Sequence, residues 1–360
     1  MLNSMKKMQA VVLLSAAALA CGFYAVAQEG AGTPGTQDPL QQAAVTSRLA
    51  PRSVLVAVTR AGDRRLVAVG ERGHILLSDD GGTTWRQASV PVSVTLTAVR
   101  FVDAQQGWAV GHSGVVIHTR DGGDHWEIQL DGRRMLTLLA EAAGTSDAAA
   151  RERIERLQQD GPDKPVLNLH FTDAMKGLVV GAYGLAFETL DGGKQWRPLL
   201  GDLPNPEERH LYAVHERADG LYLAGEQGLM WRRAPGQSAF ESLKTPFQST
   251  VFDLASGDDG SLLALGLGGK LHRSTDRGQN WSSSEPAGKA ALTASAKVPG
   301  GLVLTGEAGQ LLFSSDGGAS FQTLAGHGFP TAGLVAAPGQ LVAVGPLGVN
   351  VFPFPSDKRN

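Results

Sequence analysis

The sequence predicts an all-β fold, a seven-bladed β-propeller built from four-stranded blades. Three observations lead to this prediction: one glycine-containing phrase recurs seven times, most intervals are close to 40 residues, and a second phrase follows six of the copies. Radial stacks of four-stranded repeats of about 40–45 residues form propellers. The 46 glycines among 360 residues also fit a fold with many tight turns.

The first phrase is a G-x-x-G turn between two apolar runs, as in LVAVGERGHILL (66–77). We expect a hairpin here between the second and third strands of each blade, with glycine supplying a positive φ. A single G-x-x-G carries little weight, but seven in register indicate seven equivalent blades. The first glycines of the seven copies are Gly70, Gly111, Gly181, Gly225, Gly266, Gly306 and Gly345.

The second phrase, as in SDDGGTTW (78–85), is predicted to form the turn between the third and fourth strands. Its aspartate can accept backbone N–H groups of the turn, and its aromatic residue can bury a large ring at the start of the outer strand. Because the pattern recurs in five equivalent turns, we interpret it as structural and not as a catalytic or metal site. The aspartates are Asp80, Asp121, Asp191, Asp276 and Asp316, and the aromatic residues are Trp85, Trp126, Trp196, Trp281 and Phe321.

The end of the repeat array predicts how the ring closes. The seventh copy stops after three strands, which would leave an unpaired edge. We expect the missing outer strand to come from the N-terminal segment at residues 43–50. Such a shared blade would tie the two ends of the chain together.

One interval between copies is much longer than the others and predicts an insertion at residues 131–165, between blades 2 and 3. Segments 133–144 and 146–161 have helical patterns, Ser146 is a suitable N-cap, and each segment ends at a glycine. Pro162 and Pro165 stop the second helix. We therefore expect a helical hairpin.

The first 27 residues have the pattern of a secretory signal peptide. Lys6 and Lys7 precede the apolar stretch 10–20, and Ala25-Val26-Ala27 favours cleavage after Ala27. The pattern predicts a periplasmic or secreted protein with no transmembrane segment in its mature chain. The expected organisation after residues 1–27 is a flexible leader at 28–42, the propeller at 43–355 and a tail at 356–360.

The amino-acid composition excludes several kinds of chemistry from the mature protein. The single cysteine, Cys21, lies in the segment expected to be removed, so disulfides and thiol nucleophiles are excluded from the mature chain. Acylation of Cys21 is disfavoured because Ala18 stands where lipoprotein signals prefer leucine. A formal net charge of -3 gives no overall field for nucleic acid. We expect no nucleic-acid partner, no metal and no cofactor.

Taken together, the signal peptide, the seven blades and the two recurring phrases resemble the photosystem II stability/assembly factor family over about residues 43–355. The D-G-P-D-K-P run (160–165) is similar to that of its proteobacterial relatives from non-phototrophs. The resemblance implies a non-enzymatic scaffold that binds a protein client. It also implies, in the non-phototroph branch, a periplasmic accessory whose partner is a membrane-complex subunit or a component of a resistance-nodulation-division exporter.

Two groups of residues are candidate binding sites. The first is a basic face on the insertion, for which the alternative is an ordinary solvated helix: Arg133, Arg134, Arg151, Arg153, Arg156 and Lys164. The second is a column on the inner strands, predicted to line the central channel, for which the alternative is a structural role: Arg100, His170 and His215, continued in blades 5 to 7 by Ala255, Ser295 and Val335.

An enzyme is the alternative class, because turns of the second type also occur in sialidases and other glycoside hydrolases. The Arg-Ile-Pro start motif of sialidases is absent, and the chain has only four tyrosines. We therefore assign no catalytic residue. Two carboxylates facing each other across a cleft would favour a glycoside hydrolase instead.

Overall fold

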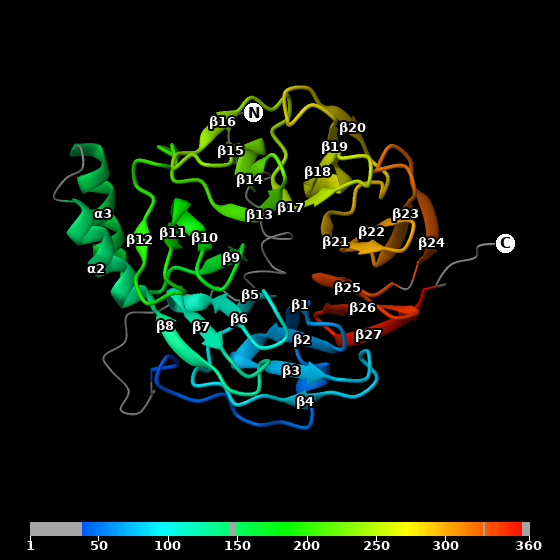
Figure 1. Ribbon diagram of the computed structural model, residues 1–360, viewed down its shortest axis with the longest axis horizontal. Coiled ribbons are helices and arrows are strands. Elements are labelled where there is room, and N and C mark those ends of the chain that lie inside the picture. The colour runs from blue at the N-terminus through cyan, green and yellow to red at the C-terminus, as the bar shows by residue number, and fades with distance from the viewer. Residues whose placement is uncertain (1–37, 144–147, 327, 355–360) are drawn as a thin grey trace, which may run out of the picture.

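The computed structural model describes residues 38–143, 148–326 and 328–354, and they form a ring of seven antiparallel sheets around a central channel (Figure 1). Each sheet has its strands in chain order, from the innermost strand outward. The prediction of a seven-bladed, all-β propeller is therefore confirmed. The signal peptide, the first ten residues of the leader (28–37) and the tail predicted from the sequence lie outside the described residues.

The first four blades have four strands each. They are β1 (Leu55–Ala61), β2 (Arg65–Gly70), β3 (Ile75–Ser78) and β4 (Arg86–Gln87); β5 (Leu96–Phe101), β6 (Gly107–Gly111), β7 (Val116–Thr119) and β8 (Glu127–Leu130); β9 (Val166–Phe171), β10 (Gly177–Gly181), β11 (Ala186–Thr189) and β12 (Arg197–Pro198); β13 (Leu211–Arg217), β14 (Gly220–Gly225), β15 (Met230–Arg233) and β16 (Glu241–Leu243).

The remaining three blades differ only at the end of the chain, where the last blade has three strands. They are β17 (Val251–Ser256), β18 (Leu262–Gly266), β19 (Leu271–Ser274) and β20 (Ser282–Ser284); β21 (Leu292–Val298), β22 (Gly301–Gly306), β23 (Gln310–Ser314) and β24 (Gln322–Gly326); β25 (Gly333–Ala337), β26 (Gln340–Gly345) and β27 (Gly348–Pro353).

The G-x-x-G turns confirm that glycine supplies a positive φ, and they show which of the two glycines does so. The first glycine of each turn does not have a positive φ; Gly111, for example, has φ -174°, which is extended backbone. A Cβ at this position would run into the carbonyl oxygen of the residue just before the inner strand, such as Thr95 O beside Gly111. Glycine is needed here because two backbones approach closely, and it is the second glycine, such as Gly114 with φ 66°, that has the left-handed conformation.

The second phrase forms the predicted turn between the third and fourth strands. In blade 5, Asp276 Oδ1 accepts the backbone N–H of Asn280 at 2.8 Å, and this bond, together with those from the Asn280 and Ser274 side chains, lowers the Asp276 pKa to about 2. The Ser274 hydroxyl also accepts the Gly278 N–H at 2.8 Å. These aspartates hold their own turns, in agreement with a structural role.

The aromatic residue of the same phrase fills the space between neighbouring blades. Trp126 is 7% exposed, packs in the apolar cluster shared by blades 1 and 2, and meets Phe101 edge-on with 6.0 Å between ring centroids. Its Nε1 donates to Gly123 O at 2.8 Å. The Trp126 side chain therefore packs between two blades and is also hydrogen-bonded to its own turn.

The predicted closing strand is wrong. Residues 43–50 form no strand, and blade 7 has only β25, β26 and β27. The segment follows blade 1 instead: Ala44 N donates to Val90 O, and the Gln87 side chain bonds to Ser47 N and Val45 O. With its hydrogen bonds made to blade 1, it cannot pair with β27. The short helix η1 (Ala50–Arg52) then packs against the start of β27 without pairing with it: Pro51 lies against Gly348, and Ala50 shares an apolar cluster with Val349.

The start of the propeller also differs from the sequence prediction. Residues 38–42, assigned to a flexible leader, are packed: Leu40 is buried in the cluster of blades 1 and 2, and Ser93 N donates to Pro39 O at 2.9 Å. The apolar leucine among polar neighbours anchors this segment. The ordered part therefore begins earlier than predicted.

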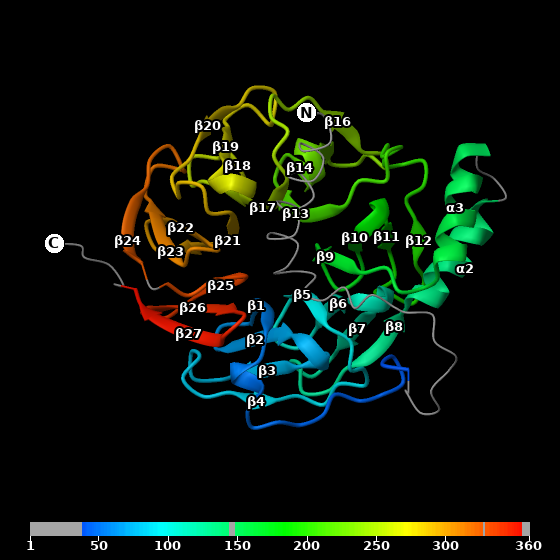
Figure 2. The same cartoon turned by 180° about the vertical axis from the view of Figure 1, so that it is seen from behind.

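The insertion is the predicted helical hairpin, α2 (Gly132–Ala143) and α3 (Ala148–Asp160), on the outer side of the ring beside β8 and β12 (Figures 1 and 2). Met135 and Leu139 of α2, with Ile154 and Leu157 of α3, are buried in the same cluster as Trp108 of blade 2. The expected N-cap, Ser146, lies outside the described residues. No helix in the described part of the chain is long and apolar enough to cross a membrane.

Candidate functional site: the central cavity

A cavity of about 710 Å³ occupies the centre of the ring, and the innermost strands of all seven blades contribute to its wall. One column of these strands, defined by the strand register, carries mostly very small side chains. Ala57, Ala98, Ala294 and Gly333 occupy it, with Asn168 and Asp253 as the polar members in the wall. Small residues at this level leave the channel open.

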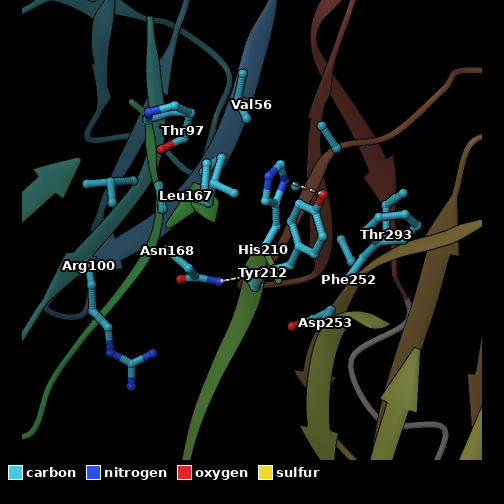
Figure 3. Close-up of a pocket in the computed structure, with 18 of the residues that line it drawn as sticks. Val56, Thr97, Arg100, Leu167, Asn168, His210, Tyr212, Phe252, Asp253 and Thr293 are labelled. Atoms are coloured by element: carbon cyan, nitrogen blue, oxygen red, sulfur yellow. Dashed lines mark hydrogen bonds between the residues drawn. The ribbon is translucent and has the colours of Figure 1, made fainter. Parts of the chain in front are cut away.

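A β-bulge repeated in six inner strands aims a further side chain into the cavity. In β5, for example, the pairing with β6 shifts between Leu96 and Ala98, so Thr97 is the extra residue. Bulges redirect side chains in this way. We call these residues the bulge ring; its members, all labelled in Figure 3, are Val56, Thr97, Leu167, Tyr212, Phe252 and Thr293.

One side of the cavity wall is aromatic. Tyr212 and Phe252 of the bulge ring meet edge-on with 5.5 Å between ring centroids. His210 continues the arc, 6.2 Å from Tyr212, and Tyr183 follows at 5.1 Å from His210. Figure 3 shows His210, Tyr212 and Phe252 side by side along the wall. This aromatic arc, Tyr183, His210, Tyr212 and Phe252, offers a half-buried surface to an apolar or planar group.

Two polar residues in the wall have defined partners. Asn168 Nδ2 donates to Tyr212 O at 2.7 Å. Asp253 accepts the Ser295 hydroxyl at 2.6 Å and the Leu254 N–H at 2.9 Å. Burial raises the pKa of Asp253 to about 6, against the two hydrogen bonds that favour its charged form.

The raised pKa of Asp253 predicts a pH-dependent cost. The unfolded chain ionises this carboxyl near pH 3.8 and the folded chain near pH 6, so stability falls as pH rises between these values. We expect Asp253→Asn to increase the unfolding free energy by about 3 kcal/mol at pH 8 and to leave it unchanged near pH 3, where the carboxyl is protonated in both states. Urea unfolding of both proteins at the two pH values measures this. An equal effect at both pH values would show that the carboxyl is not titrating as described.

The structure places the predicted channel column differently from the sequence expectation. Arg100 lines the cavity, but His170 and His215 do not. The three residues are equivalent in the strand register. Their column lies on the face of each sheet that packs against the next blade. His170 Nε2 therefore meets Glu216 of blade 4 at 2.8 Å, and His215 Nε2 meets Ser256 of blade 5 at 2.7 Å.

These histidines are structural and neutral near neutral pH. Burial, followed by the positive charges of Arg217 and Arg100, lowers the pKa of His215 to about 4. Burial also lowers the pKa of His170. The register corrects the continuation of the column too: Ala296, not Ser295, is the equivalent residue in blade 6. Of the residues predicted for this column, Arg100 and Ser295 line the cavity, and His170 and His215 do not.

The basic residues of the insertion mostly serve to fix it in place. Arg153 is largely buried and donates to Tyr183 O at 2.8 Å, while Arg156 reaches Glu208, before β13, at 2.5 Å. The other pairs are Arg156–Glu152, Arg133–Asp38, Arg134–Glu141 and Lys164–Asp163, and Arg151 is exposed. Arg153 and Arg156 meet at Glu208, and Arg153 and Lys164 both contact Tyr183, while partner binding by this set stays a prediction.

The bulge ring and the aromatic arc were missed by the sequence reasoning. A bulge interrupts the alternation of side chains by which a strand is recognised in a sequence. The extra residue of the bulge is then assigned to the wrong face of the strand. Tyr183 was hidden for another reason: it occupies the third place of a G-x-x-G turn, with φ 55°. Alignment of the residues three positions before the predicted column would have placed Tyr212 and Phe252 in register.

The cavity wall contains two carboxylates, and each has its own partner: Asp163 pairs with Lys164, and Asp253 is bonded to Ser295. Within the described ranges, no three His, Cys, Asp or Glu side chains come together to hold a metal. The fold and the cavity define the class of protein: a rigid β-propeller with turns of the Asp-box type and a wide, partly aromatic central cavity.

Comparison with known proteins gives the family. The model for the family described as "Photosynthesis system II assembly factor YCF48" matches residues 45–136 and 149–248, more than half of the chain. The chain therefore belongs to this family, as its resemblance predicted.

Similar sequences belong to the same family, and a solved structure has the same fold. The Photosystem II assembly protein Ycf48 of Thermosynechococcus vestitus is 25% identical over 264 residues, which cover 66% of this chain and 74% of the relative. That of Synechococcus sp. (strain JA-2-3B'a(2-13)) is 25% identical over 271 residues, covering 66% and 78%. A structure of YCF48 bound to D1 peptide has a TM-score of 0.63 at 19% identity, covering 89% of this chain and 98% of that one.

Proposed function

We propose that this protein is a non-enzymatic assembly factor, exported from the cytoplasm, that binds a segment of a protein client in its central cavity. The observation that carries the proposal is the aromatic arc in the wall of a 710 Å³ cavity. Concave sites with aromatic walls and a few polar groups are the usual binding sites of proteins. Membership of a family of assembly factors, and a solved family member bound to a D1 peptide, support a protein as the ligand.

The mechanism follows from rigidity and shape. The ring is already formed, so it loses little ordering entropy when a segment binds. The aromatic side of the cavity can hold an apolar or planar side chain, while Arg100 at the wall can meet an acidic one. We infer that the client is a subunit of a membrane complex, a component of an exporter included, and that the insertion, through its exposed Arg151, adds a second contact.

Photo-crosslinking in the native cells tests this proposal. A benzoylphenylalanine at Phe252 is expected to form a specific adduct with one client, identified by mass spectrometry. Tyr212→Ala in the same chain should reduce that adduct at least tenfold, because it removes the ring that lies between His210 and Phe252 in the aromatic arc. Val56→Ala is the matched control, since Val56 is a bulge-ring residue away from the aromatic arc; it should change the adduct less than twofold.

Two outcomes would contradict the proposal. An adduct from Phe252 that is insensitive to Tyr212→Ala would show that the aromatic arc does not bind the client. A client adduct obtained only from a crosslinker at Arg151 would place binding on the insertion and not in the cavity.

A further inference from the structure

The outer edge of blade 7 is the one blade edge without a fourth strand in the described part of the chain. The six other blades have their third strand covered by β4, β8, β12, β16, β20 or β24. β27 instead ends its sheet, and both views show it at the rim of the ring (Figures 1 and 2). An uncovered edge is a template for another extended chain.

The register shows which backbone groups of β27 point outward. Gly345 pairs with Gly348 across a two-residue turn, and Phe354 N donates to Gly339 O at 3.0 Å, so hydrogen-bonded pairs alternate from these positions. Val349 and Val351 fall between them and direct their N–H and C=O groups away from β26. No backbone bond to another described segment of the chain takes up these groups.

The side chains around this edge are apolar to an unusual degree. Val351 is 38% exposed, and Leu347, in the turn before β27, is 66% exposed. Leu49 is also 66% exposed and precedes η1, whose Pro51 and Arg52 lie against Gly348. Exposed apolar residues gathered beside open backbone groups mark an interaction surface.

The charges at one end of the edge define the partner. Arg48 and Arg52 are exposed on the segment that meets the start of β27. A strand added antiparallel to β27, as the outer strand is in every complete blade, would bring its C-terminal end beside these arginines. β27 itself carries no acidic residue, so symmetric pairing with a second copy would leave these arginines without a partner of opposite charge.

We propose that the open edge of β27 binds an extended segment of a partner protein, apolar in alternation and acidic at its C-terminal end, by adding it as the fourth strand of blade 7. Main-chain bonds to Val349 and Val351 provide affinity, and Arg48 and Arg52 select the acidic end. This site lies outside the central cavity and does not depend on binding there.

The probe is a labelled synthetic peptide, Thr-Val-Thr-Val-Thr-Val-Glu-Glu, measured by fluorescence anisotropy with the chain beginning at Gln28. Val351→Pro removes one outward N–H without breaking a bond inside the sheet and is expected to weaken binding at least tenfold. Val351→Thr keeps the N–H and is the matched control, expected to stay within threefold. Arg52→Glu should abolish the preference for this peptide over one ending in Lys-Lys.

A second measurement keeps the test independent of how well the proline variant folds. Hydrogen exchange on the unaltered chain should show the peptide protecting the Val349 and Val351 amides, and a peptide N-methylated at alternate residues should give no protection. Three results would overturn the proposal. The first is no binding of the peptide at about 1 mM, the weakest affinity of interest, and the second is equal binding by Val351→Pro. The third is a concentration-dependent dimer that Val351→Pro abolishes, which would assign the edge to a second copy.

Discussion

Trp126→Ala is expected to lower the free energy of unfolding by about 3–5 kcal/mol, the usual cost of removing a buried tryptophan. Trp126 is 7% exposed, fills the cluster between blades 1 and 2, and bonds its own turn through Gly123 O. The alanine would leave a cavity that the surrounding strands cannot close, because both sheets are fixed in the ring. For a domain of this size the melting temperature should fall by about 10 °C.

Trp126→Phe is the matched control, because blade 6 already has a phenylalanine, Phe321, in the equivalent place. It keeps most of the apolar contact and loses the Nε1 hydrogen bond, so the expected cost is about 1–2 kcal/mol. Chemical unfolding followed by circular dichroism measures both. If the two variants lost the same stability, burial of the ring would not be what joins these blades.

Gly306→Ala is expected to cost about 3 kcal/mol or more and to reduce the soluble yield sharply. The reason is the close approach of two strands: a Cβ on Gly306 would lie far inside contact distance of the Ala291 carbonyl oxygen. Neither group can move without breaking the pairing of β21 with β22, where Leu292 and Gly306 are partners.

Gly268→Asn provides the comparison within the same kind of turn. Gly268 has φ 70°, and beyond its chain neighbours no atom lies within 4 Å of the place that a Cβ would take. The equivalent residue of blade 3 is Tyr183, also with positive φ. Asparagine tolerates this conformation, so we expect a change of less than about 1 kcal/mol. Comparable losses for Gly306→Ala and Gly268→Asn would contradict the explanation from backbone contact.

The fold was predictable because each blade repeats its own chemistry. Seven glycines and five aspartate-to-aromatic turns in register count the blades without any structure, and the extra residues with helical spacing locate the insertion. What the repeats could not predict is where their regularity ends. The sequence of residues 43–50 does not show whether this segment packs on blade 1 or on blade 7. Its position on blade 1 depends on contacts such as that of Gln87 with Ser47.

The candidate site was less predictable than the fold, for a physical reason. Alignment of inner strands identified Arg100, His170 and His215 as equivalent, but equivalence in register does not say whether a side chain enters the channel or meets the next blade. His170 and His215 instead bond to Glu216 and Ser256 of the neighbouring blades and stay out of the channel. Phe252 enters the cavity because of a bulge, which is a feature of pairing between strands and leaves no mark on one strand alone.

Blade 7 and blade 1 meet without sharing a strand, and a buried apolar cluster that includes Leu55, Leu76 and Val344 closes the ring between them. Within the described residues, side-chain contacts hold the joint, such as Gln340 Nε2 with Gly81 O, but no backbone ladder crosses it. Local opening of a native protein begins where the fewest cooperative bonds must break. Separation of blades 1 and 7 would leave every sheet intact but would expose the buried cluster of Leu55, Leu76 and Val344, so apolar packing between side chains is what keeps the ring closed.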